Sequence, residues 1–458
     1  MEKTKRPGFF GKKDVDMTEG SIFNHILMFA LPLLIGNLFQ QFYNTVDTWV
    51  IGNYVENEAA YAAVGSVGPI INMLIGFFAG FSSGAGVVIS QNFGAKRFDK
   101  VDKAVHTSAF VTLILGVVFT ALGIALIPFM LEMMETPESV FSEAKTYLTI
   151  YFSGIIGLMI YNIGSGILRA VGDSTRPFLF LVVSALLNVV LDLLFVIKFD
   201  MGVAGVAYAT IIAQGVSALL VIITLLTTDN CVKMVPSHLK IDKETLGKIV
   251  KVGFPAALQL SITAFSNVFV QSYINQFGAE CMSGWTSYAK IDQFMFLPMQ
   301  SLAIAATTFV GQNLGGGNVE RAKKGIKTSM LMSVVSTVAI MIPIMIFPGP
   351  LVYFFNKNPL VIEYGVMLLR WISPFYVLCC FNQILAGALR GAGNSRAPMI
   401  IMLTSFVAFR QVYMFVMSNF ICNEIIPIAM GYPAGWLISS LLSFAYYKRV
   451  DLKKEVVV

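Results

Sequence analysis

Long apolar stretches recur along the whole chain and restrict what it can fold into. A helix needs about 20 mostly apolar residues to cross a bilayer. Twelve stretches of the sequence reach this length, which predicts an all-α membrane protein with twelve transmembrane helices. The expected spans are 22–46, 58–84, 104–127, 144–166, 177–198, 203–226, 249–275, 285–309, 327–347, 360–387, 397–419 and 427–447.

The composition agrees with a membrane location. Hydrophobic residues make up 56% of the chain and charged residues only 13%, whereas soluble domains are about 45–50% apolar and about 25% charged. This balance excludes a soluble enzyme, a disordered chain and a nucleic-acid-binding protein. The five cysteines form no CxxC pair and have no neighbouring histidine, so neither a disulfide framework nor a cysteine metal site is expected.

The positive charges are sorted between the two sides of the membrane. Of 32 Lys and Arg residues, 26 lie in segments on the same side as the N-terminus, three lie on the opposite side and three lie inside spans. Such an excess marks cytoplasmic loops. Both termini are therefore expected in the cytoplasm, and the N-terminal segment has no signal-peptide cleavage site. A bacterial or archaeal plasma membrane is the expected location.

The second half of the chain repeats the first. SQNFGAKRFDKVDKAVHTS (90–108) matches GQNLGGGNVERAKKGIKTS (311–329), and LRAVGDSTRP (168–177) matches LRGAGNSRAP (389–398). Ordered matches at a nearly constant offset indicate an internal duplication. Because each half has an even number of predicted helices, the halves are expected to be parallel repeats around a central cavity, as in many secondary transporters.

The duplication predicts five segments. They are a cytoplasmic N-terminal tail (1–21), an N-lobe of six helices (22–227), a cytoplasmic linker (228–248), a C-lobe of six helices (249–447) and a cytoplasmic C-terminal tail (448–458). No GxxxxGK[ST] nucleotide-binding loop occurs in the sequence. The simplest energy source is therefore an ion gradient.

Two carboxylates lie inside predicted spans of the N-lobe. Asp47 is in the first span and Asp192 in the fifth, where Asn188 lies one turn away; Thr210 is in the sixth. A charge near the bilayer centre is costly and usually functional. Carboxylate, amide and hydroxyl oxygens suit a small cation such as Na⁺, and close carboxylates also hold a proton near neutral pH. Either ion remains open at this point.

Polar stripes mark the first and seventh spans as candidate cavity walls. Steps of three and four residues place Asn37, Gln40 and Asn44 on the face of the first span that carries Asp47. In the seventh span a four-residue spacing aligns a second, uncharged stripe. Its members are Gln259, Thr263, Asn267, Gln271 and Asn275.

Three charged residues of the C-lobe have two interpretations. Lys290 and Asp292 fall in the eighth span and Arg410 in the eleventh. Lys290 and Asp292 are two residues apart and do not face each other on a helix. The three residues either line a substrate pathway or form structural ion pairs across the lobe.

The motifs together resemble the MATE family of multidrug and toxic compound extrusion transporters. The resemblance rests on QNFGA (91–95), QNLGG (312–316), the LRAVGDSTRP and LRGAGNSRAP pair, and above all LLNVVLDLLF (186–195) followed by GVAGVAYATIIAQ (202–214). It covers almost the whole chain. It implies a two-lobed antiporter that exports organic, often cationic, compounds in exchange for H⁺ or Na⁺, acts as a monomer and needs no cofactor.

The resemblance also implies roles for particular residues. In the DinF-like branch, Asp47, Asn188, Asp192 and Thr210 match the cation-site pattern, Asn162 matches a further polar member, and Pro32 lies where the first helix bends. The NorM-like branch uses acidic residues in the seventh and tenth helices, and the seventh span here has none. The DinF-like branch is therefore the expected one.

Two other functions remain as alternatives. Related folds act as flippases for lipid-linked sugars or polysaccharide precursors, but a diphosphate substrate calls for a strongly cationic cavity. Only Lys290, Arg370 and Arg410 lie at membrane depth here. A membrane-embedded enzyme is disfavoured because no DDxxD-type metal cluster occurs and the three histidines fall at helix ends or in loops.

Overall fold

The computed structural model describes residues 15–54, 58–134 and 136–458, and these residues are almost entirely helical. Within α1 and α2 some side chains, those of Asn44 and Asp47 among them, lie outside the described part of the chain. The first half consists of α1 (Ile22–Tyr54), α2 (Glu58–Gly94), α3 (Phe98–Met133), α4 (Glu138–Ser153), α5 (Ile155–Ala170), α6 (Thr175–Asp192), the π-helix η1 (Leu193–Lys198) and α7 (Gly202–Thr227).

The second half has more breaks in its helices than the first. After the short 3-10 turn η2 (Pro236–His238), it consists of α8 (Lys243–Asn275), α9 (Ala279–Gly315), α10 (Val319–Ile346), α11 (Pro348–Phe355), α12 (Pro359–Ile372), η3 (Ser373–Phe375), α13 (Tyr376–Ala392), α14 (Arg396–Met402), η4 (Leu403–Phe409), α15 (Arg410–Val416), η5 (Met417–Ile421), α16 (Ile425–Ala429) and α17 (Gly431–Arg449).

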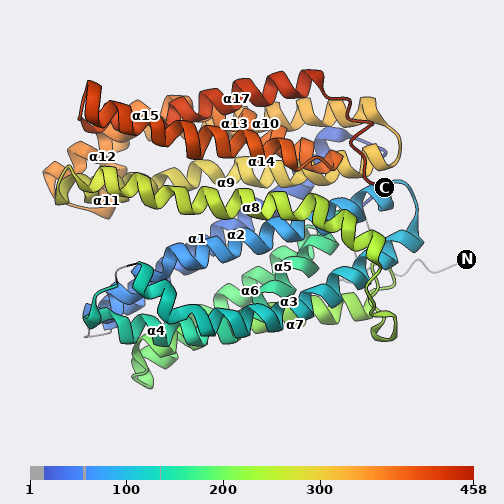
Figure 1. Ribbon diagram of the computed structural model, residues 1–458, viewed down its shortest axis with the longest axis horizontal. Coiled ribbons are helices and arrows are strands. Elements are labelled where there is room, and N and C mark those ends of the chain that lie inside the picture. Colours follow the sequence, from blue (N-terminus) through green and yellow to red (C-terminus); the bar gives the residue numbers. More distant parts are fainter. Residues whose placement is uncertain (1–14, 55–57, 135) are drawn as a thin grey trace, which may run out of the picture.

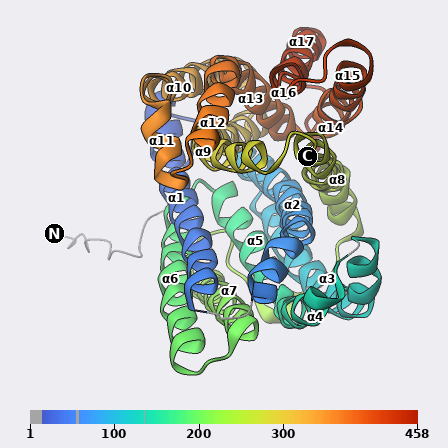
Figure 2. The same ribbon diagram turned by 90° about the vertical axis from the view of Figure 1, so that its left-hand side faces the viewer.

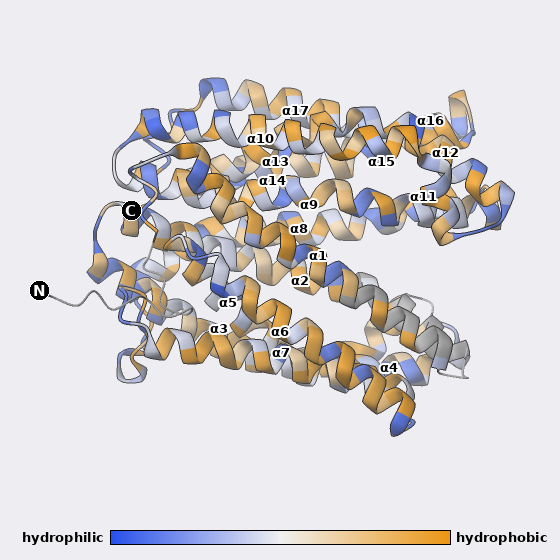
Figure 3. Ribbon diagram, turned by 180° about the vertical axis from the view of Figure 1, so that it is seen from behind, coloured by the Kyte–Doolittle hydropathy of each residue, from blue (hydrophilic) through white to orange (hydrophobic). Residues whose placement is uncertain are grey.

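The helices run side by side as a membrane bundle (Figure 1). Among the described residues, eleven helices or helix runs are long and apolar enough to cross a bilayer. The pair α4 and α5, bent by 47°, brings the total to twelve when it is counted as one broken span. Hydrophobic residues follow the lengths of the helices, and hydrophilic residues gather toward the ends of the bundle (Figure 3). The predicted all-α membrane fold with twelve spans is confirmed.

The break between α4 and α5 was not predicted, because the sequence indicates only one span over 144–166 and does not report a bend within it. The two helices meet at Gly154, where a side chain would lie 2.5 Å from the side chain of Ile211 on α7. The absence of a side chain therefore allows α7 to pack directly against the bend. Hydropathy alone does not report such a bend, because most residues around Gly154 are apolar.

Most helices extend beyond their predicted ends. The sequence predicts spans over 58–84 and 285–309, whereas α2 continues to Gly94 and α9 to Gly315. The extensions contain the QNFG and QNLG motifs, whose polar side chains lower the hydropathy. Hydropathy reports the part of a helix that crosses the bilayer, while backbone hydrogen bonding continues past the membrane surface.

The connection between the lobes is shorter than the predicted linker, because α8 already begins at Lys243. Asp242 caps this helix and accepts a hydrogen bond from the backbone N–H of Thr245 at 2.9 Å. A hydrogen bond from the Thr245 hydroxyl, together with this backbone bond, lowers the pKa of the Asp242 carboxyl. Upstream, the backbone N–H of Val235 donates to Nε2 of His106 on α3 at 2.9 Å. The connection is thus fastened to the first lobe.

The two lobes separate clearly when the bundle is viewed along its length (Figure 2). The first lobe consists of α1 to α7 and the second of α8 to α17. The first helix of each lobe nevertheless begins within the core of the other lobe. Ile26 and Phe29 of α1 pack in a core cluster with α9 and α13. Ile249 of α8 packs with α2 and α3. The exchange ties the lobes together at the end of the bundle that carries Val15 and the C-terminus, which we call the tail end.

Glycines allow the lobes to approach closely along the contact between α2 and α8. A methyl group added at Gly80 would overlap the backbone of Ala257, and one at Gly84 would overlap Gly253. Halfway along the bundle the hydroxyl of Ser261 donates to the carbonyl of Met73 at 3.0 Å. We call this contact, from Ser261 to the tail end, the seam.

Two glutamines from the duplicated QN motifs bridge the seam at the tail end. The Gln91 amide donates to the carbonyl of Gly391 in the second lobe, and the Gln312 amide donates to the carbonyl of Ala170 in the first, both at 2.9 Å. Each glutamine oxygen also accepts a bond from a terminal segment. Gln312 accepts from the backbone of Met17 at 2.9 Å, and Gln91 from that of Val457 at 3.0 Å. The contacts that close the tail end are therefore related by a pseudo-twofold axis, as the duplication of the sequence predicts.

Candidate functional site

The first lobe contains a buried polar face on α6. Ser184, Asn188 and Asp192 follow one another at four-residue steps and have exposed fractions of 8%, 2% and 0%. The hydroxyl of Ser184 donates to the carbonyl of Ala213 on α7 at 2.8 Å, so this face is turned toward α7. Thr210 is buried on α7, where its hydroxyl bonds to the carbonyl of Val206. The structure thus places three of the predicted cation-site residues on two packed helices.

The backbone and side chains around Asp192 are arranged unusually. The α-helix ends at Asp192, and the π-helix η1 begins at the next residue; π-helical turns occur frequently at functional sites. One turn earlier, both polar atoms of the Asn188 amide are buried and have no hydrogen-bond partner among the described residues. An unbonded buried amide is costly. The site therefore offers an amide oxygen beside a buried carboxylate.

The remaining predicted members of the cation site are Asp47 and Asn162. Asp47 lies on α1, which packs against α6 where Gly36 meets Phe178 and Leu181. The side chain of Asp47 lies outside the described residues. On α5, the Asn162 amide nitrogen donates to the carbonyl of Leu158 in its own helix at 2.9 Å. The roles of both residues stay predictions.

The second lobe holds a carboxylate site of its own. Asp292 on α9 is half-buried and accepts hydrogen bonds from the hydroxyls of Tyr288, at 3.3 Å, and Tyr376. The two tyrosine oxygens lie 3.2 Å apart. Aromatic rings pack around them in tilted and edge-to-face pairs, with ring centroids 5.1 to 6.1 Å apart. We call these rings the aromatic cluster; its members are Trp285, Tyr288, Tyr376, Tyr432 and Trp436.

Arg410 lies at the edge of the aromatic cluster. Its side chain is only 4% exposed, and its guanidinium carbon lies 4.6 Å from the ring centre of Tyr432. The same guanidinium donates to the hydroxyl of Ser266 and the amide oxygen of Asn267 on α8, both at 3.0 Å. The arginine thus fastens α15 to α8 through neutral partners and an aromatic face.

The three charged residues of the second lobe do not pair with one another. Within the described ranges, no ion pair joins Lys290, Asp292 and Arg410. Lys290 is exposed and its ammonium lies 5.7 Å from the ring centre of Phe355. Of the two interpretations given by the sequence, the structural ion pair receives no support. Asp292 is the acid of this group, and its side chain is partly exposed.

The predicted polar stripes have mixed surroundings. The Asn37 amide on α1 donates to the hydroxyl of Ser301 on α9 at 3.4 Å and so bridges the lobes. On α8 the Gln259 amide contacts the sulfur of Met402 at 2.8 Å, and the hydroxyl of Thr263 is buried without a bond among the described residues. Gln271 donates to Asn275 at 2.8 Å. Gln40 is half-buried, and Asn44 lies outside the described side chains.

The sequence analysis missed the tyrosines of the second lobe. Tyr288 precedes Asp292 by four residues, a spacing that places both on one helix face, and this signal was present in the sequence. Tyr376, Tyr432 and Trp436 come from distant helices. Their approach depends on tertiary packing, which one sequence does not reveal.

A metal-capable group also lies outside both lobe interiors. Ligand atoms of Asp102, His106 and His238 lie within 4.8 Å of one another. Both ring nitrogens of His106 already have partners, the carbonyl of Asp102 at 2.8 Å and the backbone N–H of Val235. This group therefore serves the connection between the lobes.

Two related six-helix lobes that meet at a glycine-lined seam, each with a polar site inside the membrane, define a transport protein of the alternating-access class. Comparisons with known proteins identify the family. The MatE family model matches residues 32–194 and 255–416, once in each half of the chain. The chain therefore belongs to the MatE family of membrane transporters and is not an enzyme.

Curated relatives and solved structures agree with this membership. The probable multidrug resistance protein YpnP of Bacillus subtilis is 31% identical over 438 residues, which are 95% of this chain and 97% of that protein. YoeA of the same organism, also described as a probable multidrug resistance protein, is 28% identical over 100% of this chain and 99% of its own. An outward-facing structure of a multidrug resistance MATE transporter superimposes with a TM-score of 0.90 at 24% identity, over 97% of this chain and 99% of that one.

Proposed function

We propose that this protein is a secondary active exporter of organic small molecules, which it exchanges for H⁺ or Na⁺ across the plasma membrane. The multidrug resistance names of YpnP and YoeA support the substrate class. The charge asymmetry of the sequence supports a cytoplasmic tail end.

The buried carboxylate of Asp192 is the observation that carries this proposal. Its side chain is fully buried on the face of α6 that packs against α7. A carboxylate inside a membrane lobe is costly when charged, so binding a cation or a proton there changes the energy of the lobe strongly. We assign ion binding to Asp47 and Asp192, and we assign supporting oxygens to Asn188, Thr210 and Asn162. This first-lobe site is the reason for placing the protein in the DinF-like branch.

The second lobe suits an organic cation. Aromatic faces attract cations, the more so where water is excluded, and Asp292 adds a negative charge at the accessible edge of the aromatic cluster. Its partner hydroxyls keep that carboxylate in place. We assign the remaining wall of the substrate pathway to polar residues of both lobes. These are Asn37, Gln40, Asn44, Gln259, Thr263, Asn267, Gln271, Lys290 and Arg410.

The transport cycle alternates between an open and a closed tail end. The seam is closed here by Gln91 and Gln312, which corresponds to a cavity open to the outside. An external ion neutralises the first-lobe site and removes its desolvation cost. α1 then rearranges around Pro32, which lies inside this helix and removes one backbone hydrogen bond. Substrate leaves to the outside, and the ion leaves after the seam opens.

Transport in proteoliposomes tests the proposal. Purified protein is reconstituted with a fluorescent organic cation, and pH and Na⁺ gradients are imposed separately. The proposal expects substrate movement driven by at least one gradient and collapse of that movement when the gradient is dissipated. Movement of a lipid-linked sugar across the bilayer without movement of the organic cation would instead support a flippase.

A further inference from the structure

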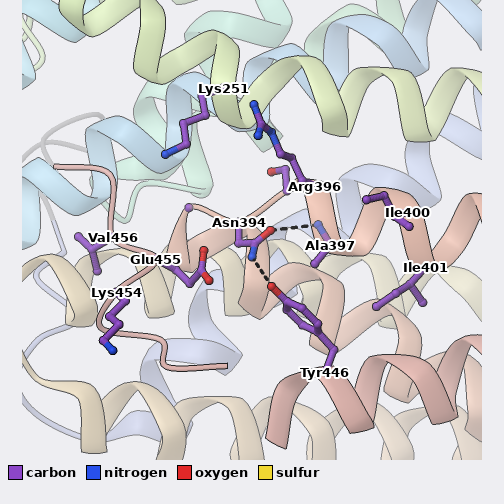
Figure 4. A pocket seen from close by; sticks show the side chains of 12 residues that line it. Lys251, Asn394, Arg396, Ala397, Ile400, Ile401, Tyr446, Lys454, Glu455 and Val456 are labelled. Carbon is purple, nitrogen blue, oxygen red and sulfur yellow. Dashed lines mark hydrogen bonds between the residues drawn. The ribbon is translucent and has the colours of Figure 1, made fainter. Parts of the chain in front are cut away.

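A pocket of about 460 Å³ opens at the tail end of the second lobe (Figure 4). It lies where the start of α14, the C-terminal segment and α8 come together. The connection before α14 forms its floor, and Asn394 is fixed there by bonds to the hydroxyl of Tyr446 and the backbone of Ala397.

The pocket is cationic. Lys251 of α8, Arg396 of α14 and Lys454 of the C-terminal segment line it, together with a single acid, Glu455. All three basic side chains are exposed, and in the described part of the chain none of them forms an ion pair. Three cations in the lining of one pocket, with one glutamate as the only acid there, favour an anionic ligand.

A buried hydroxyl supplies an independent sign of a ligand. Ser395 lines the pocket and is 1% exposed, and its Oγ has no hydrogen-bond partner among the described residues. A buried polar atom without a partner costs free energy. An oxygen-rich ligand in the pocket would accept a bond from this hydroxyl.

The matching place in the first lobe lacks these features. The duplication aligns Asp173 with Asn394 and Thr175 with Arg396. There, Asp173 pairs with Arg176 at 3.3 Å and accepts bonds from the backbone of Thr175 and Arg176, both at 3.1 Å. That pocket measures only about 70 Å³. The duplication also aligns Arg176 with Ala397, so each lobe has one arginine here, while the second lobe lacks the acid. The two charges of the first lobe pair with each other, whereas the second lobe keeps a positive charge at Arg396.

The pocket borders the membrane. Arg396 is the first residue of a span that runs to Ile421, and Lys251 lies in the first turns of the span formed by α8. The apolar part of the lining includes Ile400, which is 59% exposed on the surface of the bundle. Basic pockets at the cytoplasmic ends of membrane helices bind acidic lipid headgroups.

We propose that this pocket binds the phosphate headgroup of an anionic phospholipid. The phosphate oxygens contact Lys251, Arg396 and Lys454 and accept a bond from Ser395, and an acyl chain follows Ile400 into the bilayer. The lipid also fastens the C-terminal segment, whose Val457 bonds to Gln91 across the seam. An occupied pocket therefore stabilises the closed tail end.

The test measures lipid binding and does not depend on substrate or coupling ion. The full-length protein in neutral detergent is titrated with phosphatidylglycerol, with phosphatidylcholine and with inorganic phosphate. Lipid adducts are counted by native mass spectrometry and thermal stability is followed in parallel. The variants Arg396→Gln and Lys454→Gln are compared with Lys453→Gln, which removes a neighbouring exposed charge outside the pocket.

Phosphatidylglycerol is expected to bind and to raise the melting temperature of the parent and of Lys453→Gln. Each pocket substitution is expected to weaken its binding about fivefold. Equal binding by all variants, or equal binding of phosphatidylcholine, would overturn the proposal. Stabilisation by inorganic phosphate that matches phosphatidylglycerol would overturn the lipid assignment and leave a soluble phosphate compound as the ligand. Loss of transport with lipid binding intact would count against the proposed function only.

Discussion

The interiors of the two lobes differ much more than their folds. In the first lobe the carboxylate of Asp192 lies on α6 beside the amide of Asn188 and faces α7. The matching helix of the second lobe has Tyr413 in place of Asp192, and the half-buried carboxylate of that lobe, Asp292, lies instead on α9 next to two tyrosines. One lobe thus places a buried amide one turn before its acid, and the other places tyrosine hydroxyls and aromatic rings next to its acid.

At the seam, by contrast, the two lobes make matching contacts. Gln91 and Gln312 each donate a hydrogen bond to a backbone carbonyl of the opposite lobe at the same distance. Each also accepts a hydrogen bond from the backbone of a terminal segment. After duplication, the contacts that both lobes share kept their symmetry, whereas the interiors acquired separate chemistry. This contrast supports a division of labour in which the first lobe binds the coupling ion and the second binds the substrate.

The largest effect is expected from Asp192→Asn. The substitution keeps the shape of the side chain and removes its charge, so the first lobe no longer responds to the ion. Gradient-driven efflux in proteoliposomes should fall to the level of protein-free liposomes. Asp99→Asn, which removes an exposed carboxylate of α3, should transport normally. Full transport by Asp192→Asn would remove the first lobe from ion coupling.

A large but different effect is expected from Gly80→Ala. The added methyl group overlaps the backbone of Ala257, and overpacking of this kind costs about 1–3 kcal/mol. The closed seam is therefore destabilised, and spin labels at the tail end of the two lobes should report longer distances. Gly86→Ala on the same helix is the control, because its nearest neighbour would lie at 3.5 Å. Unchanged distances in Gly80→Ala would contradict the assignment of the seam as a gate.

The smallest effects are expected at the seam glutamines, and they should be equal. Gln91→Ala and Gln312→Ala each remove one bond between the lobes and one bond to a terminal segment. Both variants should lower the melting temperature by a few degrees, as expected for about 1 kcal/mol per lost hydrogen bond. A large difference between the two variants would show that the symmetry of the seam does not extend to its energetics.

The sequence predicts the architecture well because hydropathy and charge report directly on the membrane. The twelve spans follow from patterns within single segments, and the duplication follows from matches between the two halves of the chain. The break at Gly154 was not predicted because apolar residues continue on both sides of it, and the extension of α2 to Gly94 was not predicted because its polar motif lies outside the apolar pattern.

The candidate sites likewise contain some contacts that local sequence spacing predicts and others that only the fold brings together. Asn188 and Asp192 are one turn apart, so their shared face is visible in the sequence. Tyr376 reaches Asp292 from a helix 84 residues away, and no local pattern predicts such a contact. The cationic pocket around Arg396 also escaped the sequence analysis, because the C-terminal segment closes it only in three dimensions.

One measurement tests the division of labour most directly: the affinity of the purified protein for an organic cation, measured across a range of pH and Na⁺ concentration. The parent protein should bind the substrate more weakly when the coupling ion is abundant. Asp192→Asn should bind the substrate with an affinity that no longer depends on the ion. Asp292→Asn should bind the substrate weakly, and its residual affinity should still depend on the ion. The opposite assignment, or loss of both properties in either variant, would contradict the account.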